Sequence, residues 1–127
     1  MDFKDLYNAA LSVAVPKELS DCAQAASVGA AILTASGNVY TGVCIDTACS
    51  MGFCAEHAAA AAMITAGESR ILKIVAVGYK GNIIPPCGRC REFLSQICFE
   101  NSEARVLVNE NTVVKLCELL PWDWRKI

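Results

Sequence analysis

The stretch ILKIVAVGYKGNIIPPCGRCREFLSQIC, residues 71–98, decides the fold because it joins a buried strand to a helix. Ile71–Tyr79 is a continuous apolar run containing Val and Ile, which is typical of a strand covered on both faces. The loop after it ends in Pro85-Pro86, and a helix is predicted over about Cys87–Cys98. Ala104–Val108 follows as a second strand. Such a strand–helix–strand unit requires a parallel, right-handed crossover in a sheet with helices packed on its faces.

The first third of the chain predicts a helix and a hairpin. Apolar residues recur at helical spacing over residues 2–15, and Pro16 ends the pattern. Ser27–Thr34 and Asn38–Ile45 have the composition of strands, and Ala35-Ser36-Gly37 between them is typical of a tight turn. The hairpin therefore precedes the strand–helix–strand unit and belongs to the same sheet.

Four shorter segments complete the predicted order. Asp46–Phe53 is small and polar, which indicates a loop, and Cys54–Ala66 is an alanine-rich helix that a glycine closes. Near the end of the chain, Thr112–Lys115 is predicted as a short fifth strand and Leu116–Leu120 as a helical turn. The 127 residues contain no internal repeat or low-complexity linker, so we expect a single domain over residues 1–127.

Composition and charge exclude several classes of function. Hydrophobic residues make up 54% of the chain, but no apolar run reaches the ~20 residues of a membrane helix, and the N-terminus lacks the pattern of a secretory signal. The net charge of −2 comes without a dense basic run, which argues against binding nucleic acid. We expect a small-molecule substrate, no membrane partner, and a subunit interface that covers the surplus apolar surface.

Eight cysteines in a chain without an export signal favour a reducing cytoplasm over a disulfide framework. Three of them belong to the motifs described below. The other five are expected to be small buried hydrophobic residues. These are Cys22, Cys44, Cys49, Cys98 and Cys117.

Two motifs carry chemistry: Cys54-Ala55-Glu56 and Pro86-Cys87-Gly88-Arg89-Cys90. Cys87 and Cys90 are three residues apart, so they are neighbours on one helix face, and each motif opens a predicted helix. Unpaired N–H groups at a helix N-terminus lower thiol pKa values. Three thiolates that converge on one ion suit Zn²⁺, with Zn–S distances of about 2.3 Å.

The spacing of the first motif adds a geometric condition. Residues two apart point to different sides of a regular helix. Cys54 and Glu56 therefore share a site only if Cys54 is at the very first position, where its direction is not yet helical. The carboxylate then reaches past the metal toward water and substrate without binding the metal.

Other interpretations of the cysteines remain open at this stage. A C-x-x-C pair alone is compatible with a redox pair or with half of a structural zinc site. A fourth thiol such as Cys49 would complete a structural Cys₄ site, in which Glu56 has no role. His57, the only histidine, is either a ligand or, as we prefer, a hydrogen-bond partner of the ligands.

TGVCIDTACSMGFCAEHAAA (residues 41–60) and PPCGRCREFL (residues 85–94) closely resemble the two site helices of the cytidine deaminase family. The likeness runs from about Val28 to Pro121. C-x-E with P-C-x-x-C is the signature of zinc-dependent base deaminases in the variant with cysteine in place of the histidine ligand. The resemblance implies a three-layer α/β/α cytidine deaminase-like fold with a mixed five-stranded sheet.

The resemblance also implies an activity and its parts. It implies a hydrolytic deaminase that converts cytidine or deoxycytidine to uridine or deoxyuridine and releases ammonia. Cys54, Cys87 and Cys90 would hold Zn²⁺, and Glu56 would be the catalytic acid and base. Small members of the family are usually homotetramers, so we expect a homotetramer or a homodimer.

The positions that bind the sugar differ from the family pattern. Its nucleoside-specific members carry an aromatic residue two positions before V-G-A-A, and Asn and Glu that bind the ribose hydroxyls. Ala26, Cys44 and Asp46 occupy these positions here, and Ala55 is a fourth candidate substrate contact. His57 likewise stands where the family commonly has an arginine that supports the thiolates.

These departures keep two alternatives open. Blasticidin-S deaminases, a related branch, also alter the sugar-binding positions while keeping P-C-G-x-C-R and a C-terminal E-L-L-P, which is residues 118–121 here. The first alternative is therefore a blasticidin-S deaminase-like enzyme that acts on a modified cytosine nucleoside. The second is a non-catalytic, zinc-stabilised domain.

Trp122 and Trp124 either reach a neighbouring subunit's pocket or pack at an interface.

Overall fold

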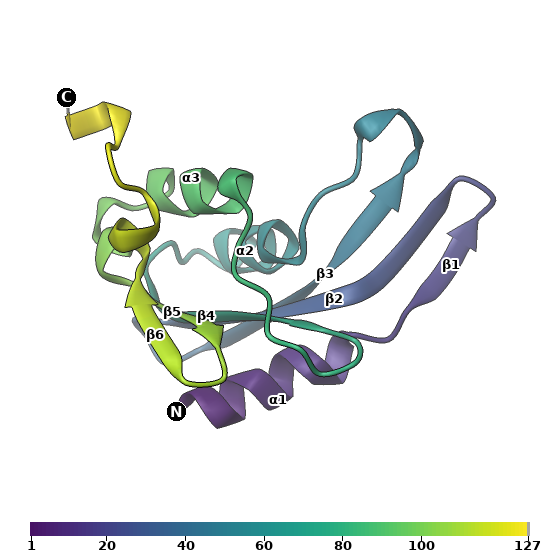
Figure 1. Cartoon of the computed structure of the whole chain (residues 1–127), viewed down its shortest axis with the longest axis horizontal. Helices are drawn as coiled ribbons and strands as arrows, with labels where there is room; N and C mark the ends of the chain where they lie inside the picture. The colour runs from purple at the N-terminus through teal and green to yellow at the C-terminus, as the bar shows by residue number, and fades with distance from the viewer. Residues whose placement is uncertain (127) are drawn as a thin grey trace.

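The computed structural model describes residues 1–126, in which six strands form one sheet and three α-helices cover it (Figure 1). The strands are β1 (Lys17–Ser20), β2 (Ala23–Thr34), β3 (Val39–Thr47), β4 (Ile71–Gly78), β5 (Arg105–Asn109) and β6 (Thr112–Lys115). The helices are α1 (Phe3–Val13), α2 (Ala55–Thr65) and α3 (Gly88–Gln96). Short 3₁₀ turns join some of these elements.

Strand β2 organises the sheet because both of its edges are paired. One edge pairs with β3, and residues 28–34 of the other edge pair with β4, in both cases antiparallel. Strand β5 then pairs with β4 in parallel, and β6 pairs with β5 antiparallel. Because α3 lies between β4 and β5 in the chain, the predicted parallel crossover is confirmed.

The helices lie on opposite faces of this sheet, with α1 below it and α2 and α3 above it in Figure 1. The alternation of side chains along β2 accounts for the two layers of core. Ala30 and Ile32 pack in the core cluster between the sheet and the helices α2 and α3, whereas Ala31 and Leu33 pack in the cluster between the sheet and α1. The predicted three-layer arrangement with a mixed sheet is confirmed.

Two glycines bring the helices unusually close to the sheet. A Cβ atom at Gly42 of β3 would collide with the backbone of Ala58 and Ala59 in α2, and one at Gly29 of β2 would collide with Ala10 of α1. The alanines of α2 complement Gly42, since only small side chains allow a helix to lie so close to a strand. Gly42 therefore fixes the height of α2, the helix that carries the first motif.

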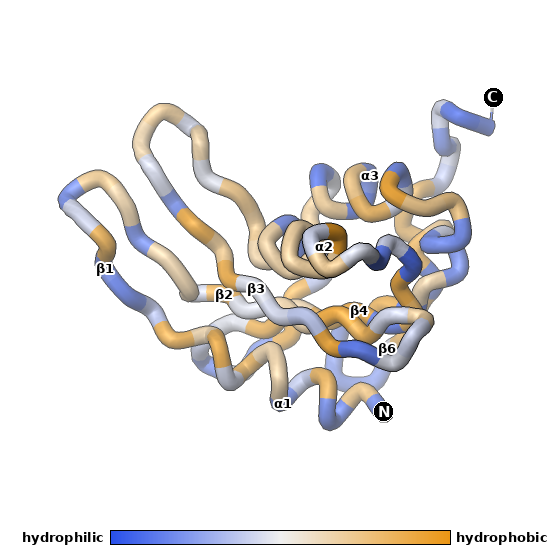
Figure 2. The backbone as a smooth tube through the Cα atoms, turned by 180° about the vertical axis from the view of Figure 1, so that it is seen from behind, coloured by the Kyte–Doolittle hydropathy of each residue, from blue (hydrophilic) through white to orange (hydrophobic). Residues whose placement is uncertain are grey.

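The predicted count of five strands is wrong, because β1 adds a sixth. The sequence of β1, KELS, lacks the apolar alternation by which strands are recognised, because all four residues are exposed and none has to face a core. It pairs with the start of β2, beyond the end of β4, and extends away from the helices (Figure 1). In Figure 2 a hydrophilic stretch is visible in β1, whereas β4 is mostly hydrophobic.

A bulge interrupts the pairing of β2 with β3. The register shifts between Ala25 and Gly29, and Ala26 within this interval has a positive φ of 70°. The bulge separates the part of β2 that pairs with β1 from the part that pairs with β4.

None of the helices in residues 1–126 combines the length and the apolar character needed to cross a membrane.

Candidate metal and catalytic site

The two motifs meet because their helices start at the same edge of the sheet. Strands β3 and β4 run in the same direction, since each is antiparallel to β2, and α2 and α3 follow them in the chain. Cys54 is the N-cap residue of α2 and Cys87 is the N-cap residue of α3, and both have extended backbone angles. Cys90 lies one turn into α3. All three thiols therefore face the positive ends of two helices.

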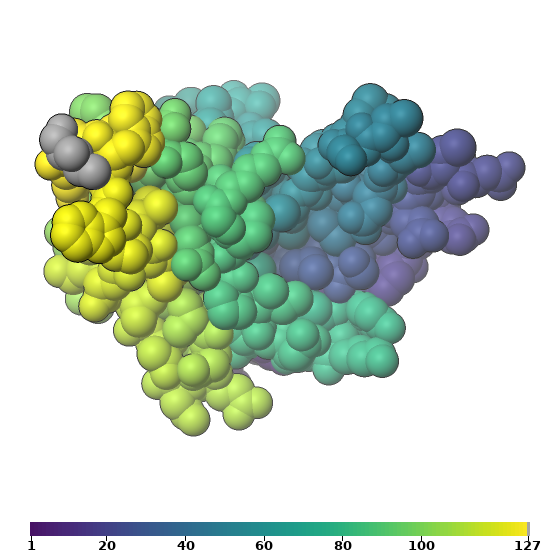
Figure 3. Space-filling view, turned by 45° about the horizontal axis from the view of Figure 1, so that its top comes forward, coloured from purple at the N-terminus to yellow at the C-terminus, as the bar shows by residue number. Residues whose placement is uncertain are grey.

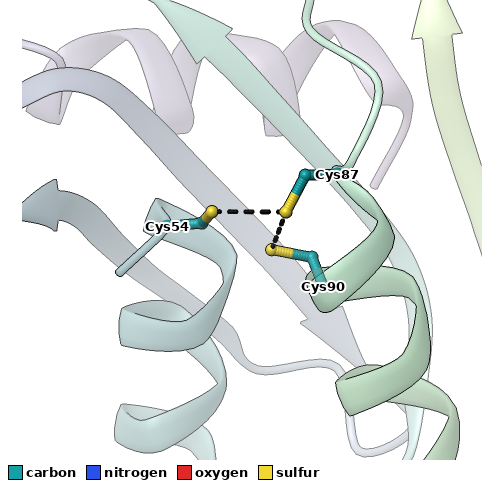
Figure 4. A group of neighbouring side chains, drawn as sticks. All are labelled: Cys54, Cys87 and Cys90. Carbon is teal, nitrogen blue, oxygen red and sulfur yellow. Dashed lines mark hydrogen bonds between the residues drawn. The ribbon is translucent and has the colours of Figure 1, made fainter. Parts of the chain in front are cut away.

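The three sulfur atoms point toward one another (Figure 4). The Sγ atoms of Cys54 and Cys87 are 3.4 Å apart, and those of Cys87 and Cys90 are 3.5 Å apart. All three lie within 4.8 Å of one another. Tetrahedral zinc with Zn–S distances of about 2.3 Å separates its sulfur ligands by about 3.8 Å. The cluster therefore fits a zinc ion after a small adjustment of the thiols.

The three thiols differ in how readily they ionise, and the lowered pKa expected at the helix N-termini is found for Cys87 alone. Burial raises the pKa of Cys54 and Cys90, and the nearby carboxylate of Glu56 raises the pKa of Cys90 further. Burial acts in the same direction on Cys87, but hydrogen bonds, first from the backbone N–H of Cys90, outweigh it and lower the Cys87 pKa. Three thiolates at this distance repel one another, and a divalent ion between them removes that repulsion.

Glu56 lies in the first turn of α2 with 5% of its surface exposed. Burial raises the pKa of its carboxyl group above the ordinary value. Because Cys54 has extended angles of φ −76° and ψ 158°, it does not follow the helical progression, and both residues line the same cavity. The geometric condition set by the sequence is met.

The cavity beside the sulfurs has a volume of about 130 Å³. Its wall consists of the ends of β2, β3 and β4, the start of α2 and the loop before α3. The residues are Val28, Cys44, Cys54, Ala55, Glu56, Ala76, Ile84, Pro85 and Cys87. Sequence reasoning missed Val28, Ala76, Ile84 and Pro85, because apolar residues in strands and loops carry no signal that separates a cavity wall from a core.

The four candidate substrate contacts separate into two pairs. Cys44 and Ala55 line the cavity, whereas Ala26 and Asp46 do not. Ala26 is fully buried in the β2 bulge. Asp46 is exposed and lines a neighbouring cleft.

Cys44 makes two contacts through its sulfur. Its Sγ atom lies 3.3 Å from the hydroxyl of Ser27 and accepts a hydrogen bond from the backbone N–H of Val28 at 3.4 Å. Cys44 is buried, as predicted for the cysteines outside the motifs. That prediction is wrong for Cys22 and Cys49, which lie exposed in a turn and in the 3₁₀ segment Ala48–Ser50, where no core is available. Cys98 and Cys117 are half-buried.

His57 lies beside the cluster without joining it. Its Nδ1 atom is 3.3 Å from Sγ of Cys90, and its ring stacks on Phe93 with 4.3 Å between centroids. This is the position that a hydrogen-bond partner of a thiolate requires. Within residues 1–126 the group of potential ligands has three members, and Cys49 is not among them. The Cys₄ alternative therefore has no support in the structure.

The chain is similar in sequence and in fold to cytidine deaminases. The cytidine deaminase of Mycobacterium tuberculosis is 33% identical over 97 residues, which cover 75% of this chain and 70% of the relative. That of Halalkalibacterium halodurans is 32% identical over 98 residues, or 74% of each chain. The crystal structure of the M. tuberculosis enzyme matches with a TM-score of 0.80 at 30% identity over 96% of both chains. No family model matches the sequence.

The fold, the thiol cluster and these relatives define the class of the protein as a hydrolytic deaminase. Within that class, the chain belongs to the cytidine deaminase family. The family resemblance found in the two motifs is thereby confirmed over most of the chain.

Proposed function

We propose that this protein is a zinc-dependent deaminase that converts cytidine or deoxycytidine to uridine or deoxyuridine with release of ammonia. One observation carries the proposal: three sulfurs converge from two helix N-termini beside a buried carboxylate and a small cavity. The relatives named cytidine deaminase support it.

Cys54, Cys87 and Cys90 would hold the zinc ion. When bound, zinc supplies Lewis acidity that makes water a nucleophile near neutral pH. Three protein ligands leave a fourth position free for that chemistry, which is the arrangement of catalytic zinc sites. The helix N-termini at Cys54 and Cys87 and the imidazole at Cys90 offset the negative charge of the thiolates.

Glu56 would move the protons. Its carboxylate accepts the proton of the attacking water and delivers it to N3, the ring nitrogen next to the carbon that bears the amino group. The oxygen of that water adds to this carbon, C4. Glu56 then takes the proton of the new C4 hydroxyl and passes it to the amino nitrogen, the C4–N bond breaks, and ammonia leaves while the C4 oxygen becomes a carbonyl.

Burial of Glu56 supports this role in two ways. A carboxylate with 5% exposure exchanges protons with the bound substrate in preference to bulk water. A low-dielectric surrounding also brings the pKa of a carboxyl group closer to the range in which it both accepts and donates. Ala55, beside it in the first turn of α2, adds a small surface against which a flat ring can lie.

The test combines metal analysis with turnover. The protein, purified without chelators, is expected to contain one zinc per chain and to release ammonia from cytidine or deoxycytidine. Glu56→Gln is expected to keep the zinc and the melting temperature while turnover falls by at least ~10³-fold. Full turnover in that variant would refute the role of Glu56, and a wild-type protein without zinc would refute the metal site.

The substrate panel includes cytosine and blasticidin S, because one observation favours a second candidate. Cys44 in the cavity wall replaces the amide that the family resemblance leads one to expect, so a modified cytosine nucleoside is an alternative substrate. Turnover of blasticidin S alone would select it. Tight zinc binding without turnover of any member of the panel would favour a non-catalytic domain.

We propose further that the chain is a single domain of residues 1–127 and assembles as a homotetramer or homodimer. Large apolar side chains on the surface support an interface. Phe99 is 82% exposed and Trp122 is 90% exposed, and both line one groove by the C-terminal segment. Figure 3 shows that segment, in yellow, on the surface. Sedimentation equilibrium tests this, and a monomer at micromolar concentration would contradict it.

A reducing cytoplasm remains our prediction for the compartment. All eight cysteines are free in the structure, and two of them, Cys22 and Cys49, are exposed. Thiolates bind zinc only while they stay reduced, so a reducing compartment suits the site. Fractionation of the native host cell, with detection by antibody, tests the prediction.

A further inference from the structure

The cavity beside the sulfurs is small and almost entirely apolar. Its volume of about 130 Å³ corresponds to about four waters at ~30 Å³ each, and lies below the ~300 Å³ at which ligand pockets usually begin. This space suits one flat ring and not a whole nucleoside. Among the described residues that line it, the polar side chains are Glu56 and the thiols.

Where β2 and β3 line the cavity, at Val28 and Cys44, neither side chain is a strong hydrogen-bonding group for a sugar. Cys44 is the residue of β3 that lines the cavity, and its sulfur is already in contact with the hydroxyl of Ser27 and the backbone N–H of Val28. A thiol is also a weak donor and a weak acceptor compared with an amide. Cys44 therefore presents an apolar surface to the substrate.

The polar side chains of this region line a different space. A cleft of about 210 Å³ lies between β1, β2 and β3, and Ser27 is part of its wall. The charged and amide side chains of this cleft are Lys17, Glu18, Gln24 and Asp46. Because Ser27 lines the cleft and Cys44 lines the cavity, their contact of 3.3 Å lies between the two spaces. Asp46 does not line the ring cavity.

We infer that the enzyme selects its substrate by the cytosine ring and not by the hydroxyl groups of an attached sugar, and that Cys44 is the residue responsible. The inference rests on the proposed function. In a pyrimidine, N1 lies opposite C4, so a sugar on N1 leaves the ring at the end farthest from the reacting carbon. The substrate class is therefore cytosines whose N1 substituent need not carry hydroxyl groups.

The test compares kcat/KM of the zinc-loaded protein for cytidine, 2′-deoxycytidine and 2′,3′-dideoxycytidine. A site built around a sugar hydroxyl rejects analogues that lack it by up to ~10⁴-fold, whereas an unused hydroxyl changes the rate by no more than about threefold. We expect the three values to agree within about threefold. Turnover of cytidine that exceeds that of the dideoxy compound tenfold or more would overturn the inference and leave the proposed function intact.

Failure of the proposed function gives a different result, because then none of the three compounds releases ammonia, and both proposals fall. The role of Cys44 is tested by Cys44→Asn, with Cys44→Ala as the matched control. Asparagine offers an amide to the sugar, so we expect its preference for cytidine over the dideoxy compound to rise about three- to tenfold, the worth of one hydrogen bond. Alanine offers no hydrogen-bonding group and is expected to keep the wild-type ratio. An unchanged ratio in a folded Cys44→Asn protein would refute the assignment to Cys44, and the wild-type comparison stands whether or not that variant folds.

Discussion

Replacing Gly42 by alanine tests how closely the position of α2 controls the site. The Cβ atom of alanine would lie 2.6 Å from the carbonyl carbon of Ala58 and 2.7 Å from its Cβ, and closer still to the backbone nitrogen of Ala59, whereas ordinary contact begins at 3.4 Å. Backbone atoms cannot rotate away as a side chain can. Helix α2 must therefore move outward by about 1 Å to relieve the collision.

Such a movement has separate effects on stability and on activity. Overpacking of this kind destabilises a core by about 1–3 kcal/mol, which lowers the melting temperature of a chain of this size by about 4–12 °C. Cys54 and Glu56 move with α2, whereas Cys87 and Cys90 stay with α3. A misplacement of about 1 Å in a catalytic arrangement can reduce the rate about 100-fold.

Gly29→Ala is the matched control, because it produces a similar collision on the opposite face. Its Cβ atom would meet the backbone oxygen of Ala10 and lie 2.9 Å from Cγ2 of Val13 in α1, a helix that carries no proposed site residue. Differential scanning fluorimetry measures stability, and ammonia release per bound zinc measures activity. We expect both variants to melt earlier and only Gly42→Ala to lose about two orders of magnitude in kcat/KM. Equal losses of activity in the two variants would refute the reasoning.

Three further substitutions test other parts of the structure. Asn101 is fully buried and makes three hydrogen bonds of 2.7 to 3.1 Å to backbone groups of other segments, so Asn101→Ala is expected to lower the free energy of unfolding in urea by about 3 kcal/mol. His57→Ala removes the hydrogen-bond partner of Cys90, and we expect zinc transfer to a competing chelator to be about tenfold faster; an unchanged rate would exclude the supporting role. Hydrogen bonds, first from Asn38, lower the pKa of Glu68 from 4.5 to about 2, so its ionised form stabilises the fold above pH 4.5 and the benefit is lost as the pH falls toward 2. Glu68→Gln should therefore melt below wild type at pH 7, with a difference that shrinks below pH 4.5, and a difference that does not change with pH would contradict this.

The parts of the fold that the sequence predicts are those set by local patterns. The apolar run of β4 and the helical spacing of α1 depend on short-range periodicity, and Gly67 and Pro16 mark the ends of α2 and α1. The convergence of the two motifs was also accessible, since two helices that follow strands of the same direction start at one edge of the sheet. Spacing therefore brought the thiols to one edge of the sheet, and the resemblance to the cytidine deaminase family implied that these three hold zinc.

The features that escaped prediction depend on contacts between distant residues. Strand β1 has four exposed residues and exists only because β2 offers an edge beyond the end of β4. The bulge at Ala26 places a non-glycine residue at a φ of 70°, which no local signal in the sequence announces. The cavity wall combines Val28 with Ala76, which are neighbours only because β2 and β4 pair.

The placement of the cysteines also explains how one small site would tolerate the negative charge of the proposed zinc complex. Three thiolates with Zn²⁺ would carry a net charge of −1, and an ionised Glu56 would add another. Each helix N-terminus contributes a partial charge of about +0.5, and both Cys54 and Cys87 are N-cap residues, where that field is strongest. The two helix ends therefore offset about one unit of charge. A carboxylate can then stay beside the thiolates in a buried position, and His57 at Cys90 needs to supply only a hydrogen bond and no positive charge.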